Sequence, residues 1–133
     1  MPRAHGLFEV NLQPQALSEQ GQNAALGRLS IDKQFHGDLA ATSIGEMLSA
    51  MTPVEGSAGY VALERVTGSL QGRNGSFTLQ HNGLMARGAP QLTISVVPDS
   101  GAGELEGIAG SMAILIEGGQ HRYELEYTLP DME

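Results

Sequence analysis

The chain has 133 residues, enough for one domain with a substantial core. Its formal net charge is −8 with only seven lysine and arginine residues, which argues against nucleic acids and anionic membranes as partners, because both are bound through clustered basic side chains. Cysteine is absent, so disulfides, thiol nucleophiles and thiolate metal sites are excluded. The first ten residues lack the apolar stretch of a signal peptide, and no 18-residue apolar run occurs; we therefore expect a soluble, cytoplasmic protein.

Glycine is frequent, with 18 residues, and aromatic residues make up only 5% of the chain, a composition that favours short strands and tight turns over a helical bundle. His5–Gln13 alternates in the manner of a half-buried strand. The polar stretch 14–25 predicts a loop, with one helical turn at Gln15–Glu19. Leu26–Phe35 predicts a second strand, in which Lys33 interrupts an otherwise apolar face.

The middle of the chain predicts two further strands. The first returns from a turn at residues 36–39 and runs over Leu39–Leu48, although the sequence GEMLSAM that overlaps its end is also compatible with a helical turn. The second, Ser57–Leu70, is a long alternating run. One of its faces carries Tyr60, Ala62, Glu64 and Val66.

After that strand, Arg73–Ser76 contains Asn-Gly and predicts a turn. The chain then returns as Ser76–Gly83, which puts Phe77, Leu79 and His81 on one face, and Gln91–Val97 forms a further strand.

The C-terminal segment is the clearest hairpin. Two alternating runs, Ser111–Glu117 and Gln120–Thr128, meet at Gly118–Gly119, and a Gly-Gly pair supplies the positive φ angles of a two-residue turn. The predicted pairs are Glu117 with Gln120, Ile116 with His121, Ile114 with Tyr123 and Met112 with Leu125. About eight short antiparallel strands result, which predicts an all-β, single-domain barrel or sandwich spanning residues 1–133. An eight-stranded barrel encloses side chains or one small ligand.

Five motifs follow one another along nearly the whole chain: QFHGDL, GEMLSAM, GSAGYVALERVTG, GRNGSFTLQH and GAGELEGIAGSM. Their order resembles a bacterial family of small proteins of unknown function with an allene oxide cyclase-like barrel. The stretch from Gln91 to Leu129, with DSGAG, GIAG and YELEY in succession, also resembles allene oxide cyclase and, more loosely, dirigent proteins. The resemblance implies an antiparallel barrel, a shape whose relatives are often trimers. A barrel with an apolar outer stripe would need covering, so we expect a homo-oligomer, with a trimer favoured and a dimer as the alternative. The resemblance does not identify a catalytic residue in this chain.

Glu64 and His81 are the candidate catalytic residues. Pairing of their strands brings the two within a residue or two of each other, and a carboxylate beside an imidazole can orient it for proton transfer. The alternative is a polar pair that only satisfies its own hydrogen bonds, buried or at the surface.

Aromatic and methionine side chains are the candidate lining of an apolar pocket. The candidate ligand-binding residues are Tyr60, Phe77, Tyr123 and Tyr127. Met47, Met51, Met85 and Met112 form a second such group, since methionine adapts to oily ligands. For both groups the alternative role is packing of the core, which is the interpretation that we favour.

No metal or cofactor is expected. His36, His81, His121 and Glu46 offer imidazole and carboxylate groups, but their spacing matches no known metal motif. The chain also contains no phosphate-binding loop, nucleophile elbow or dinucleotide fingerprint.

Three functions remain open from the sequence. The first is a barrel that binds a small apolar molecule, and the second is an isomerase or cyclase-like enzyme that uses Glu64 and His81. The third is a non-catalytic structural or interaction protein whose barrel is filled by side chains.

Overall fold

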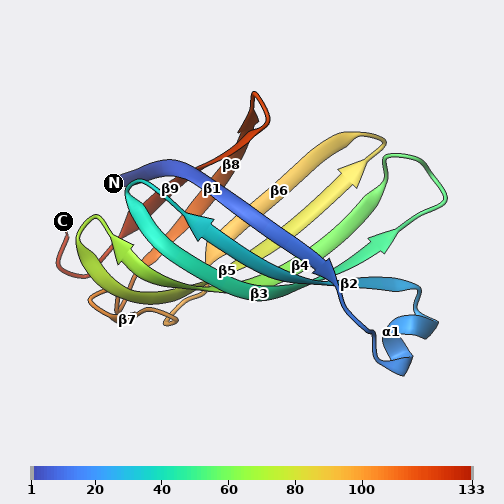
Figure 1. The fold of residues 1–133 in the computed structure, drawn as a ribbon, viewed down its shortest axis with the longest axis horizontal. Helices are drawn as coiled ribbons and strands as arrows, with labels where there is room; N and C mark the ends of the chain where they lie inside the picture. The colour runs from blue at the N-terminus through green and yellow to red at the C-terminus, as the bar shows by residue number, and fades with distance from the viewer. Residues whose placement is uncertain (1, 133) are drawn as a thin grey trace.

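The computed structural model describes residues 2–132, which form a strongly curved antiparallel sheet and one short helix (Figure 1). The strands are β1 (Arg3–Pro14), β2 (Leu26–Phe35), β3 (Leu39–Met51), β4 (Ala58–Leu70), β5 (Arg73–Ala86), β6 (Ala89–Val96), β7 (Ala102–Gly103), β8 (Ala109–Glu117) and β9 (Gln120–Thr128); the helix is α1 (Glu19–Asn23). Within residues 2–132 there is no helix of the length and apolarity needed to cross a membrane.

Eight of the strands close into a barrel. Their order is β4-β3-β2-β1-β9-β8-β6-β5, and pairing of β5 with β4 completes the ring. The short strand β7 is an addition outside this ring, paired with the beginning of β5. The predicted all-β, eight-stranded antiparallel barrel is therefore confirmed.

The C-terminal hairpin has the predicted register. Glu117 pairs with Gln120 and Ile116 with His121, and the ladder continues in step to Ala109 at the beginning of β8. Gly118 and Gly119 have φ angles of 55° and 79°, the positive values that a two-residue turn requires.

The turn between β4 and β5 lies earlier than predicted. It is formed by Gln71 and Gly72, both with positive φ, while Asn74 and Gly75 belong to the ladder of β5. Gly75 is needed there for another reason: a Cβ at this position would lie 2.1 Å from the backbone oxygen of Ala102 in β7. The Asn-Gly pair thus marks a close approach between strands, and the predicted turn at Arg73–Ser76 was wrong.

The helical segment is also displaced from its predicted position. The turn expected at Gln15–Glu19 is found instead as α1, which begins after Ser18. The Ser18 side chain accepts a hydrogen bond from the backbone N–H of Gly21 at 3.1 Å and so caps the helix. The GEMLSAM segment is part of strand β3 rather than a helical turn.

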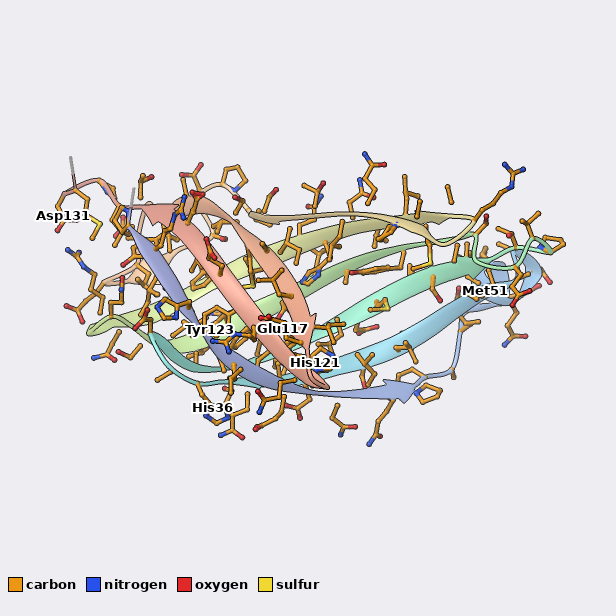
Figure 2. The ribbon with its side chains drawn as sticks, turned by 90° about the horizontal axis from the view of Figure 1, so that it is seen from above. His36, Met51, Glu117, His121, Tyr123 and Asp131 are labelled. Atoms are coloured by element: carbon orange, nitrogen blue, oxygen red, sulfur yellow. The ribbon has the colours of Figure 1, made fainter. Side chains whose placement is uncertain are left out.

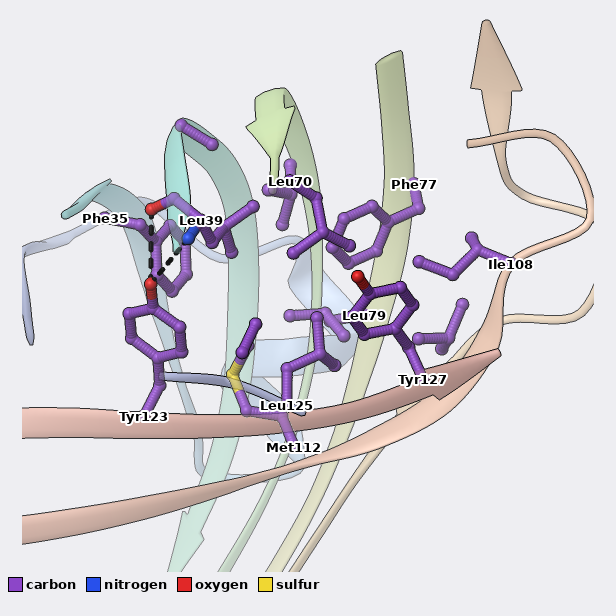
Figure 3. Packing of buried hydrophobic residues seen from close by; sticks show 14 of the residues in the cluster. Phe35, Leu39, Leu70, Phe77, Leu79, Ile108, Met112, Tyr123, Leu125 and Tyr127 are labelled. Atoms are coloured by element: carbon purple, nitrogen blue, oxygen red, sulfur yellow. Dashed lines mark hydrogen bonds between the residues drawn. The ribbon is translucent and has the colours of Figure 1, made fainter. Parts of the chain in front are cut away.

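One end of the barrel is packed with apolar side chains, and we call it the packed end (Figure 3). It carries the β2–β3 and β4–β5 turns. The Tyr123 hydroxyl donates a hydrogen bond to the backbone oxygen of His36 at 2.7 Å and accepts one from the N–H of Leu39 at 2.9 Å. These bonds tie β9 to the β2–β3 turn. The fully buried residues here include Leu39, Leu70, Phe77, Leu105, Ile108, Tyr123, Leu125 and Tyr127.

The opposite end, which we call the open end, carries the loop between β3 and β4 and the turn between β5 and β6. Figure 2 shows the length of the barrel between the two ends, with Met51 at the open end and Asp131 at the packed end. Apolar side chains are exposed at the open end, among them Met51 at 78%. The interior is therefore packed unequally along the barrel.

Candidate functional site

A cluster of four polar side chains lies inside the barrel, and we call it the charged cluster: Lys33 of β2, Ser43 of β3, Glu64 of β4 and His81 of β5. Each falls on the inward side of its strand, and each is buried. Glu64 is the centre, since Lys33 Nζ lies 2.8 Å and His81 Nε2 lies 2.5 Å from its Oε2 atom. The Ser43 hydroxyl donates to the other carboxylate oxygen, Oε1, at 2.6 Å.

The strand register explains why these residues meet. Lys33 pairs directly with Ser43 across β2 and β3, while His81 is the diagonal neighbour of Glu64 across β4 and β5. Gly45 on β3 lies opposite Glu64, where a Cβ would stand 2.0 Å from the backbone oxygen of Leu63. The absence of a side chain at Gly45 lets β3 and β4 approach closely beside the cluster.

The charge of Glu64 is strongly stabilised. Burial alone would raise the pKa of its carboxyl, but hydrogen bonding from His81, the charge and hydrogen bond of Lys33 and the hydrogen bond from Ser43 together lower that pKa to about 2. Glu64 is therefore ionised at neutral pH.

Lys33 is held by aromatic rings as well as by Glu64. Its ammonium nitrogen lies 5.0 Å from the ring centroid of Phe8 and 5.8 Å from that of Phe35. Such cation–π contacts favour a desolvated cation. With the ion pair, they account for a lysine on the inward face of an otherwise apolar strand.

His81 offers one nitrogen to the interior. Its Nε2 atom is bonded to Glu64, and Nδ1 has no hydrogen-bond partner among residues 2–132. No side-chain nitrogen or oxygen that is fully buried within these residues lacks a partner. Nδ1 must therefore contact space that solvent can reach. Because the ionised carboxylate fixes the proton on Nε2, Nδ1 of the neutral ring is a hydrogen-bond acceptor.

A cavity of about 590 Å³ occupies the open end of the barrel. Its walls come from β2 to β6 and from the loop between β3 and β4. Most of its lining side chains are apolar; they include Leu29, Met47, Met51, Val54, Met85, Pro90 and Leu92.

Tyr60 connects this cavity to the charged cluster. It belongs to the cavity lining, and its ring centroid lies 6.4 Å from that of His81, with the planes inclined by 42°. Gly83, opposite Tyr60 on β5, leaves room for the ring: a Cβ there would stand 2.2 Å from the Tyr60 Cε1 atom. Gly83 lines the cavity, and His81 is the next inward-facing residue of β5, so the histidine lies beside the inner wall of the cavity next to the Tyr60 ring.

The structure separates the residues predicted for the site. Glu64 and His81 lie together, as the strand pairing predicted, and Tyr60 lines the cavity. Phe77, Tyr123 and Tyr127 lie in the core of the packed end, and none of them lines the cavity.

The methionines divide in the same way. Met47, Met51 and Met85 line the cavity, whereas Met112 is buried in the core. Lys33 and Ser43 were not predicted as site residues. The signal for Lys33 was present in the sequence, since it interrupts the apolar alternation of its strand.

The other histidines lie apart from this cluster. His36 contacts Glu9 at 3.0 Å, and the ring of His121 packs against that of Phe8 at a centroid distance of 5.2 Å, with the planes inclined by 43°. Glu46 is paired with Arg28 on the outer surface. Within residues 2–132, no group of three or more histidine or acidic side chains has the arrangement of a metal site.

Comparison with known proteins gives a family. A family model described as "Protein of unknown function (DUF3224)" matches residues 4–127. The chain is also similar to a crystal structure of a DUF3224 protein of unknown function from Shewanella oneidensis MR-1, with 54% sequence identity, 97% of each chain covered and a TM-score of 0.91. No curated protein matches it. The chain therefore belongs to the DUF3224 family of proteins of unknown function.

Proposed function

We propose that the protein binds a small, predominantly apolar molecule in the cavity at the open end of its barrel. The observation that carries this proposal is the cavity itself: about 590 Å³, mostly apolar, with a tyrosine at its inner wall. Binding sites for small molecules have volumes of roughly 300–1,000 Å³ and combine an apolar lining with a few polar groups. The unequal packing along the barrel leaves space for a ligand at the open end.

Two features support a ligand over a barrel filled by its own side chains. Three methionines gather at the cavity, and flexible thioether side chains adapt to oily ligands of irregular shape. Leu92 and Met85 are each 43% exposed although they face inward, so apolar surface is left open to solvent where a ligand would cover it. The resemblance to allene oxide cyclase, which acts on an apolar substrate in such a barrel, supports the proposal by analogy of fold only.

Native mass spectrometry of freshly purified protein, followed by denaturing extraction, tests this proposal. Ser49→Trp should fill the cavity, because Ser49 lines it, whereas Ala50→Trp on the outer face of the same strand is a matched control. We expect a small apolar molecule with the wild type and with Ala50→Trp, and its loss from Ser49→Trp.

A titration with an apolar fluorescent dye covers the case in which the natural ligand is lost during purification. The dye should bind the wild type and the Ala50→Trp control but bind Ser49→Trp several-fold more weakly. Equal dye binding by all three proteins, or no binding by any, would contradict the proposal.

We also propose that the protein is a homo-oligomer that associates through the outer face of β3 and β4. This face exposes Ile44, Leu48, Val61 and Leu63, with Ile44 exposed at 68%. Association would remove these apolar groups from water. Size-exclusion chromatography with light scattering tests it, and a monomer at all concentrations would contradict it.

A further inference from the structure

We propose that His81, oriented by Glu64, is a proton acceptor for the molecule in the cavity, and that this molecule carries one weakly acidic hydroxyl group on an apolar, unsaturated frame, as in a phenol or an enol. This inference rests on the proposed function, because it assigns chemistry to the ligand of the same cavity.

The first step is the direction of the hydrogen bond between Glu64 and His81. Glu64 accepts hydrogen bonds from Lys33 and Ser43 and is ionised at neutral pH, so it has no proton to give to His81. His81 Nε2 must be the donor, and the neutral imidazole then carries its lone pair on Nδ1. A carboxylate that holds a histidine in this tautomer prepares the second nitrogen to take a proton.

The second step is the charge of the cluster. Lys33 and Glu64 form an ion pair with both side chains buried, and together they carry no net charge. A neutral His81 leaves the buried interior neutral, which is the least costly state away from water. When the ring takes a proton, the adjacent carboxylate is already in hydrogen-bond contact with the resulting imidazolium.

The third step concerns the other titratable groups that face His81. Lys33 of β2, Glu64 and Tyr60 of β4 are the groups near its ring. Burial, and after it the negative charge of Glu64, raises the pKa of Tyr60, so this phenol keeps its proton at neutral pH. Tyr60 does not compete with His81 as a base, and Lys33 is occupied by the ion pair.

The ligand class follows from the proton balance. A neutral hydroxyl group can enter the apolar cavity without a charge. Its O–H bond then breaks, the electron pair stays on the ligand oxygen, and the proton forms the new N–H bond on His81 Nδ1. The products are an oxyanion and an imidazolium, which stabilise each other, so the site remains neutral.

A carboxylic acid fits the same site less well. It is already ionised in neutral water, so entry into the cavity would remove water from its charge before a cationic partner is present. The charge would also lie close to the negative charge of Glu64. A hydroxyl that becomes ionised only at His81 avoids this cost.

The test uses 4-nitrophenol, whose ionised form absorbs at longer wavelength than the neutral form, and 4-nitroanisole, which has the same frame without the proton. Binding is measured by equilibrium dialysis, and the ionisation of the bound probe by its absorption spectrum. At a pH where the free phenol is mostly neutral, we expect the wild type to bind both probes and to show the long-wavelength band with the phenol alone.

His81→Phe keeps a ring of similar size but removes the acceptor nitrogen. This variant should still bind 4-nitroanisole but lose the long-wavelength band of bound 4-nitrophenol. The double variant Lys33→Met/Glu64→Gln provides a second measurement, because it removes both buried charges together and leaves His81 in place; its band should be much weaker. Asn82→Phe, an exposed position beside His81, is the matched control and should behave as the wild type.

The outcomes separate the two proposals. If 4-nitrophenol binds to the wild type without the band, or if His81→Phe keeps the band, the role of His81 is overturned while the binding cavity stands. If neither probe binds to the wild type, both the cavity as a ligand site and the role of His81 are overturned.

Discussion

The ammonium nitrogen of Lys33 lies 2.8 Å from a carboxylate oxygen of Glu64, although their strands, β2 and β4, are not neighbours in the sheet. Strand β3 lies between them, and the curvature of the closed sheet brings the two side chains together across the interior. Both side chains are buried, at 6% and 0% exposure. Removal of one partner therefore leaves the other charge in a place where water cannot solvate it.

Lys33→Met should strongly destabilise the protein. Breaking a buried ion pair by removing one partner costs about 3–5 kcal/mol, whereas replacing both charges by neutral groups is often close to neutral. We expect Lys33→Met to lower the free energy of unfolding by that amount, and Lys33→Met/Glu64→Gln to recover most of the loss. Urea unfolding measures both. Additive losses from the two substitutions would show that the pair is not coupled.

Acid should weaken the fold through Glu64. Its pKa is about 2 in the folded protein, against an ordinary value of 4.5. Because the folded state favours the ionised form, the stabilisation is complete above pH 4.5 and is lost as the pH falls towards 2. A difference of this size corresponds to about 3 kcal/mol.

Urea unfolding at a series of pH values measures this loss. The Lys33→Met/Glu64→Gln variant is the control, and it should lose less stability than the wild type over the same interval. Parallel curves for the two proteins would contradict a role for Glu64 in acid sensitivity.

Local sequence patterns account for the strands and for part of the site. Alternation decides which side chains face inward, and Glu64 and His81 lie on consecutive strands whose pairing is local. Ser43 lies on the strand next to that of Glu64, whereas Lys33 lies one strand further away. The contact of Lys33 with Glu64 depends on the curvature of the sheet, which no local pattern contains. Lys33 was nevertheless visible in the sequence as a charged residue on an otherwise apolar strand face.

Depth along the barrel was not predictable in the same way. Phe77 and Tyr60 both face inward, yet one lies in the packed end and the other at the cavity. Alternation separates inside from outside but does not say which part of the interior is filled. A local pattern also could not reveal why Gly75 is a glycine, which led to the mistaken turn at Asn74–Gly75. This glycine allows a close contact with Ala102 of β7, about 27 residues further along the chain.

The place of the Tyr60 ring should depend on the absence of a side chain at Gly83. Gly83→Ala puts a methyl group 2.2 Å from a ring carbon, so the ring must move. Overpacking of this kind costs about 1–3 kcal/mol. In the variant Tyr60→Ala the same methyl group should be tolerated, because no ring opposes it. A double-mutant cycle by urea unfolding measures the coupling, and additive effects would contradict direct contact between the two positions.

The hydroxyl group of Tyr123 should stabilise the packed end. It accepts a hydrogen bond from the N–H of Leu39, drawn in Figure 3, and donates one to the backbone oxygen of His36. Tyr123→Phe would leave both backbone groups without that partner. A buried group that loses its hydrogen bond costs about 1–3 kcal/mol. We expect a loss in this range by urea unfolding, together with faster amide exchange at Leu39.

Tyr60→Phe is the matched control for this prediction. The Tyr60 hydroxyl has no hydrogen-bond partner within residues 2–132 and belongs to the wall of the cavity, so its removal should change the stability little. The two variants remove the same atom from the same residue type at opposite ends of the barrel. Equal losses of stability in Tyr123→Phe and Tyr60→Phe would mean that the hydrogen bonds of the Tyr123 hydroxyl to the β2–β3 turn do not stabilise the fold. A larger loss for Tyr123→Phe would locate the stability of the barrel at its packed end and leave the open end free to adapt to a ligand.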